Sequence, residues 1–84
     1  MDWSKQSWDQ IRNITADELV AALKKDQWYM DESRGAVLVY RHTDGRRITV
    51  HYHPGKTYGS SLLKALIDSI GWSERDLRRL KLVK

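Results

Sequence analysis

The first regular pattern of hydrophobic and polar positions is that of a helix. Its apolar residues recur at helical spacing, at Leu19, Val20 and Leu23. Thr15 and Glu18 have the spacing of a capping box, in which two side chains satisfy backbone amides at the start of a helix. The pattern predicts a helix from Thr15 to about Asp26. Residues 1–14 form an extension before it, with three apolar side chains on one side of a helical turn or two: Trp3, Trp8 and Ile11.

The middle of the chain alternates between apolar and polar residues, as strands do. A short strand is predicted at 28–33, and runs at 36–42 and 47–53 flank Asp44-Gly45, a signature of a two-residue hairpin turn. Such a turn places the core face on Val37, Val39, Ile48, Val50 and Tyr52. The opposite face then carries Leu38, Tyr40, Thr49, His51 and His53. Its apolar members need cover from the extension or from a second protein, and a one-residue slip would exchange the faces on one strand.

Two more helices are predicted after the hairpin. The first is capped by Ser60 or Ser61 and ends at Gly71, since glycine favours the left-handed conformation at a helix C-terminus. Its buried stripe is Leu62, Leu63, Leu66, Ile67 and Ile70. Ser73 and Asp76 cap a short last helix. The order α-β-β-β-α, with a short helix added at each end, predicts an α+β fold in which a three-stranded antiparallel sheet packs on two helices.

The composition fits one small domain. The 84 residues are too few for two cores, so residues 15–84 are expected to form a single domain after the extension. The chain has no cysteine, which excludes disulfides, thiolate catalysis and cysteine zinc sites. No apolar run is long enough to span a bilayer, and the first four residues do not resemble a signal peptide. A cytoplasmic protein is expected.

Positive charge is concentrated in the middle of the chain, although the net charge is only +4. Between residues 33 and 67 the one acid is Asp44, against six basic residues: Arg34, Arg41, Arg46, Arg47, Lys56 and Lys64. All three histidines lie in the same stretch. This distribution indicates a local site for a polyanion. The alternative is a solvated basic sheet edge that discourages aggregation.

His51 and His53 are the candidates for catalysis. Two residues apart on a strand, they point to one face with Cβ atoms roughly 6–7 Å apart. Cleavage of RNA without a metal needs a base for the 2′-hydroxyl proton and an acid for the leaving oxygen, and imidazoles do both near neutral pH. The alternative is an exposed polar pair. No metal or other cofactor is expected, because His42 is far along the partner strand and no nearby acid completes a ligand set.

The loop before the leucine-rich helix is the candidate for binding. Lys56 lies there next to Gly55, a residue that lets the backbone approach a ligand. The first amides of the helix that begins near Ser60 and Ser61 offer partial positive charge to a phosphate. At the hairpin tip, two arginines are candidates for a neighbouring phosphate: Arg46 and Arg47. The alternative is an ordinary connection between strand and helix with a solvated lysine.

The residues from about Thr15 to Leu80 also resemble a known family. The shared features are Trp28 after the first helix, Gly35 at the second strand, the segment Tyr-Arg-His-Thr-Asp-Gly-Arg at 40–46, His53 with Pro-Gly-Lys at 54–56, and Ile-Gly-Trp-Ser-Glu at 70–74. In this order and spacing they are similar to the HicA (YcfA-like) family of RNA-cleaving toxins. The resemblance implies a fold like the double-stranded RNA-binding domain (dsRBD-like).

The resemblance also implies a function, but this chain departs from the family at one position. Family members are toxins of type II toxin–antitoxin pairs, mRNA endoribonucleases that a HicB-like antitoxin masks. They carry a catalytic histidine where this chain has Val37, and valine cannot transfer a proton. Three alternatives follow: an endoribonuclease that uses His51 and His53, an inactive RNA-binding module, or a protein-interaction module. The last would form an oligomer, such as a homodimer, that buries Trp3, Trp8 or Tyr40.

Overall fold

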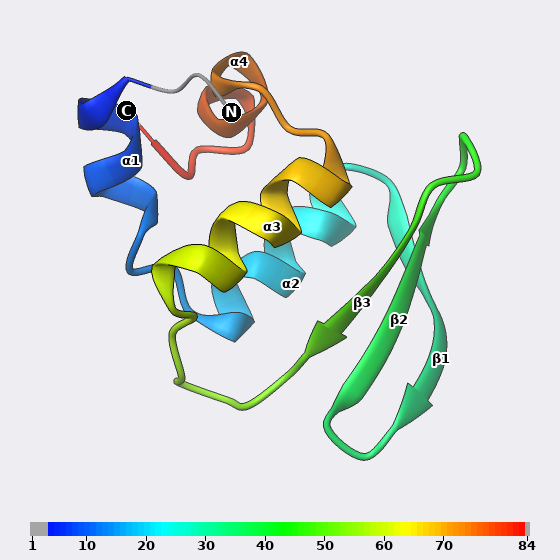
Figure 1. The fold of residues 1–84 in the computed structure, drawn as a ribbon. Helices are drawn as coiled ribbons and strands as arrows, with labels where there is room; N and C mark the ends of the chain where they lie inside the picture. Colours follow the sequence, from blue (N-terminus) through cyan, green and yellow to red (C-terminus); the bar gives the residue numbers. More distant parts are fainter. Residues whose placement is uncertain (1–3, 84) are drawn as a thin grey trace.

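The computed structural model describes residues 4–83, so the predicted position of Trp3 lies outside the described residues. Its elements are α1 (Lys5–Ile11), α2 (Ala16–Lys25), β1 (Trp28–Arg34), β2 (Val37–His42), β3 (Arg47–His51), α3 (Ser60–Ile70) and α4 (Glu74–Arg79). The strands form an antiparallel sheet in the order β1-β2-β3. Helices α2 and α3 lie against one face of this sheet, and α1 and α4 lie on the helical side (Figure 1). The predicted α+β fold class is confirmed.

Side-chain and glycine signals fix most of the helix ends. Thr15 and Ser73 each cap a helix through a capping box, as predicted. Gly71 ends α3 in the left-handed conformation, with a φ of 85°. The predicted serine cap of α3 is wrong, because the N-cap residue is Gly59, which has no side chain to cap the first turn. The Gly59 carbonyl accepts a hydrogen bond from the Leu63 amide at 2.9 Å, which closes the first helical turn.

The β2–β3 hairpin turns through three residues, 43–45, and not through the two residues Asp44-Gly45. The His42 amide donates to the Arg46 carbonyl at 2.8 Å and closes this loop. Gly45 adopts a φ of 102°, a conformation open to glycine without strain. Three-residue loops with a glycine in such a conformation are the next most common hairpins after two-residue ones. The sequence signal was right about the hairpin and wrong about its length.

The longer turn exchanges the two faces of β2. Val37 lies opposite His51, whereas a two-residue turn would place it opposite Tyr52. The face against the helices carries Leu38, Tyr40, Ile48, Val50 and Tyr52. The opposite face carries Val37, Val39, Thr49 and His51. The predicted faces are therefore wrong for β2, while Ile48 and Val50 are buried as predicted. The protein's own helices cover Tyr40, so it is not available to a second protein.

The helices and the sheet share one core, which includes residues from both ends of the described chain. Ile11 and Ile14 pack into the same cluster as the buried residues of α3 and α4. The Glu74 carboxylate of α4 accepts from the buried Ser7 hydroxyl of α1 at 3.1 Å. Helix α1 is thus built into the core. No helix in the described part of the chain combines the length and apolar character that a membrane crossing needs.

Candidate functional site

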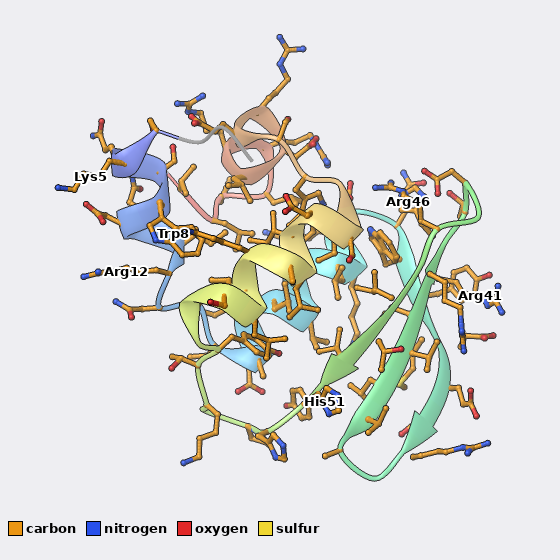
Figure 2. All side chains as sticks on the ribbon, in the orientation of Figure 1. Lys5, Trp8, Arg12, Arg41, Arg46 and His51 are labelled. Carbon is orange, nitrogen blue, oxygen red and sulfur yellow. The ribbon has the colours of Figure 1, made fainter. Side chains whose placement is uncertain are left out.

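A pocket of about 160 Å³ lies where the end of β3, the following loop and the first turns of α2 and α3 meet. Its lining is Ala16, His51, His53, Lys56, Thr57, Tyr58, Gly59 and Leu62. The structure therefore brings together three residues that the sequence singles out for chemistry: His51, His53 and Lys56. Figure 2 shows His51 at this end of the sheet, beside the helices.

The apolar wall of the pocket is the part that sequence reasoning missed. Leu62 was predicted on the buried stripe of α3, yet it is 48 % exposed and lines the pocket. Tyr58 is half-buried, and its hydroxyl donates to the His51 carbonyl at 3.4 Å. Burial raises the pKa of this tyrosine. The other wall is Ala16, 42 residues earlier in the chain than Tyr58, and no local pattern signals this contact.

The start of α2 holds the loop in place through the backbone. The Ala16 amide donates to the Lys56 carbonyl at 2.9 Å, and Thr15 and Thr57 form an antiparallel bridge. Within the loop, the Lys56 amide donates to the His53 carbonyl at 3.0 Å. These bonds fix the backbone of Lys56 and leave its side chain exposed.

Asp17 of α2 is a second anchor for the loop. Its carboxylate accepts from the Gly55 amide at 2.8 Å and from the Tyr52 hydroxyl. The hydrogen bond from Tyr52, followed by that from Gly55, lowers the pKa of Asp17, and the same contact raises the pKa of Tyr52. The Gly55 amide is thus used within the protein and is not directed at a ligand. An acid in the first turn of a helix was the one signal for Asp17 in the sequence.

The two histidines reach the pocket from different kinds of structure. Strand β3 ends at His51, so His53 lies in the loop and not in the strand as predicted. The Tyr52 amide donates to the Ala36 carbonyl at 2.6 Å. Hydrogen-bonded and non-hydrogen-bonded pairs alternate along an antiparallel ladder, so the next pair, Val37 and His51, is the kind whose side chains lie closest. Val37 is therefore the direct neighbour of His51.

The charge at the site is that of an unpaired lysine. Within residues 4–83, the Lys56 side chain has no ion-pair partner, in contrast to Arg41, which pairs with Asp31 at 2.8 Å. No group of three histidine or acidic side chains in the described residues is arranged to hold a metal ion. An exposed lysine beside an apolar hollow suits a ligand that carries both an anion and an apolar part.

Arg46 and Arg47 lie at the other end of the sheet. Strand β3 separates Arg47 from His51 by four residue steps, which is about 13 Å at about 3.3 Å per residue. Figure 2 shows Arg46 at the hairpin end, away from His51. The Arg46 guanidinium lies over the Trp28 ring at 5.0 Å, pairs with Asp44 and donates to the Ile70 carbonyl. These contacts occupy Arg46 in the fold.

Exposed Arg47 has no ion-pair partner within the described residues, and its predicted role in RNA binding, like that of Arg46, stays a prediction. Ser61 is exposed in the first turn of α3, beside the pocket residues Gly59 and Leu62. The side chain of Ser60 is not described, so the predicted contribution of the two serines also stays open.

Comparison with known proteins adds one positive finding. A family model described as "HicA toxin of bacterial toxin-antitoxin" matches residues 16–72. The match starts with α2, includes the whole sheet and α3, and ends at Trp72. It therefore includes every residue that lines the pocket. No curated protein matches the chain.

Proposed function

Because the chain belongs to the HicA toxin family of bacterial toxin–antitoxin systems, we propose that it is a toxin that binds RNA at the pocket and cleaves it without a metal ion. The observation that carries this proposal is the placing of His51, His53 and Lys56 around one hollow. Phosphate contacts supply a large share of the affinity of proteins for nucleic acids, and Lys56, which has no ion-pair partner within residues 4–83, is suited to such a contact.

The chemistry of the proposal needs two proton transfers. One imidazole of the histidine pair takes the proton from a 2′-hydroxyl, and the resulting oxyanion attacks the adjacent phosphorus. The other imidazole gives a proton to the leaving 5′-oxygen, so no metal is needed to neutralise it. Lys56 holds the phosphate that reacts. Positioned groups of this kind each contribute about 10²- to 10⁴-fold in rate.

The HicA family implies a HicB antitoxin as the partner of this protein. We propose that the antitoxin covers the pocket, because the pocket is open and no acid among residues 4–83 pairs with its lysine. An acidic or apolar segment of the partner that occupies the pocket would exclude RNA directly.

A second function on the same site is binding of RNA without cleavage. It is favoured by Val37, which stands where the family resemblance places a catalytic histidine and which packs beside His51. If the lost imidazole is essential, the remaining pair and Lys56 still form a binding surface.

A cleavage assay in the presence of a metal chelator separates the two functions. The expected result for the native chain is cleavage of a long single-stranded RNA, reduced by about a hundredfold or more in His51→Ala or His53→Ala. Thr49→Ala is the matched control, since Thr49 is exposed on the same strand and outside the pocket.

Binding is measured in parallel at two salt concentrations. Lys56→Gln is expected to weaken binding and to reduce its salt dependence by about one phosphate contact, while Lys24→Gln on α2 leaves both unchanged. An RNA that is bound in a salt-dependent way but stays intact supports the binding module. An RNA that is not bound at all refutes both functions.

A further inference from the structure

The interior of the pocket differs from its rim. The interior includes Ala16, Tyr58 and Leu62, and its exposed lining is mostly apolar. Leu62 is one of three exposed large hydrophobic residues in the described chain, with Tyr29 and Met30. A leucine at the first turn of a helix, open to solvent beside a half-buried tyrosine ring, is apolar surface that a ligand can bury.

The volume of the pocket limits what it can take. At about 160 Å³ it is smaller than the roughly 300–1,000 Å³ of pockets that enclose a drug-sized ligand. It accommodates a single flat ring system and not a whole cofactor. Three of the residues that line it carry rings: His51, His53 and Tyr58. Tyrosine and histidine rings are surfaces on which unpaired RNA bases stack.

The rim of the pocket also sets a requirement on the charge of the ligand. Lys56 is exposed at the pocket, and no acid of the described residues pairs with it. An anion would be drawn to Lys56, but it would not enter the apolar interior, because burial of an unpaired charge is very costly. The ligand that satisfies both conditions has an apolar ring for the interior and a phosphate for the rim. A nucleotide unit within a strand has this form.

From these observations we infer that the pocket takes one unpaired nucleobase of a single-stranded RNA, with the adjoining phosphate at Lys56. This inference rests on the proposed RNA-binding function. A base within a duplex is stacked on both faces and paired along its edge, so it cannot enter the pocket without leaving the helix. The protein therefore selects single strands over duplexes through this pocket.

Three fluorescent oligonucleotides of equal length test the inference with the full chain. They are a single strand without self-complementarity, the same strand with every base replaced by a stable abasic unit, and a duplex. All carry 2′-O-methyl groups, which prevent cleavage, and the two single strands have the same phosphates. The base-bearing strand is expected to bind about fivefold to a hundredfold more tightly than the abasic strand, the range for stacking of one base on an aromatic side chain.

Two matched variants locate the effect. Leu62→Gln is expected to reduce the advantage of the base-bearing strand over the abasic strand by about threefold or more. Met30→Gln is the control, because Met30 has a similar exposure, 53 % against 48 %, and lies outside the pocket. Tyr58→Leu keeps an apolar side chain but removes the ring, and it should reduce the same ratio.

The outcomes separate this inference from the proposed function. If the native chain binds the base-bearing and abasic strands equally, and Lys56→Gln weakens both, the base pocket is refuted and phosphate binding stands. If Leu62→Gln leaves the ratio of the two strands unchanged while the chain remains folded, the pocket is also refuted. If no oligonucleotide binds the native chain, the inference and the proposed function both fail.

Discussion

Asp26 is the residue on which several distant parts of the fold depend. Its carboxylate accepts from the indole N–H groups of Trp28 and Trp72, at 3.3 and 2.7 Å, and pairs with Arg79 at 2.6 Å. Partial burial raises the pKa of Asp26, but the hydrogen bonds from Trp72 and Arg79 outweigh it, so the pKa lies below its usual 3.8. One carboxylate thus joins the end of α2 to β1, to the connection between α3 and α4, and to α4 itself.

Replacement of this acid should be costly at neutral pH and not at acid pH. Asp26→Asn is expected to lower the free energy of unfolding at pH 7 by about 1.5–3 kcal/mol, because hydrogen bonds to a charged group are lost. A carboxyl group whose pKa is lowered by folding stabilises the fold above its unfolded-state pKa, and loses that effect as the pH falls through its folded-state pKa. The difference between the two proteins should therefore shrink below about pH 4.

Urea denaturation followed by tryptophan fluorescence, from pH 7 to pH 3, measures this difference. The control is Asp31→Asn, since the Asp31–Arg41 pair is largely exposed and such pairs contribute about 0–1 kcal/mol. If the difference in free energy of unfolding between the native protein and Asp26→Asn grew as the pH fell, the pKa of Asp26 could not be lowered by folding.

At the scale of elements, Arg46 connects the hairpin to the end of α3. Its guanidinium meets the Trp28 ring and the Ile70 carbonyl, one of the carbonyls that a helix C-terminus leaves without a partner. Cations at this end of a helix are favoured by its dipole. The adjacent Arg47 points to the open face of the sheet and has none of these contacts within the described residues.

The two neighbouring arginines should therefore differ in their effects. Arg46→Ala is expected to lower the free energy of unfolding by about 1–2 kcal/mol, through the lost ring contact and helix-end contact. Arg47→Ala should stay within about 0.5 kcal/mol, as surface substitutions usually do. Thermal and urea unfolding of the two variants measures the difference. Equal losses would show that the contacts of Arg46 contribute no stability.

At the scale of the whole molecule, the N-terminal extension belongs to the core on which the small fold depends. Ile11 is 1 % exposed, and the half-buried Trp8 packs against the same cluster. A core of this size supplies only about 3–5 kcal/mol. The free energy lost with one large buried side chain is therefore a large fraction of the total stability.

Ile11→Ala in the full chain is expected to lower the free energy of unfolding by about 2–4 kcal/mol. For a domain of this size, each kcal/mol lowers Tm by about 4–8 °C. Arg12→Ala, an exposed neighbour, is the control. Removal of residues 1–13 should lower Tm at least as much as Ile11→Ala. A shortened chain that melted at the native temperature would show that residues 14–84 do not depend on residues 1–13 for stability.

The sequence by itself determined the features that depend on residues a few positions apart. The capping boxes of Thr15 with Glu18 and of Ser73 with Asp76 are local, as is the left-handed end of α3 at Gly71, and all are where the sequence predicted them. The order of elements follows from the same local patterns. The gathering of histidines and basic residues before α3 also marked the region of the pocket.

Tertiary structure decided what depends on residues far apart in the chain. Asp44-Gly45 is compatible with a loop of two residues or of three, and the burial of Leu38 and Tyr40 against the helices accompanies the three-residue form. Leu62 looked like a core residue because helical spacing cannot tell which side of a stripe meets solvent. Asp17 and Gly55 are 38 residues apart. The pocket exists because packing brings such segments together, and no local signal carries that information.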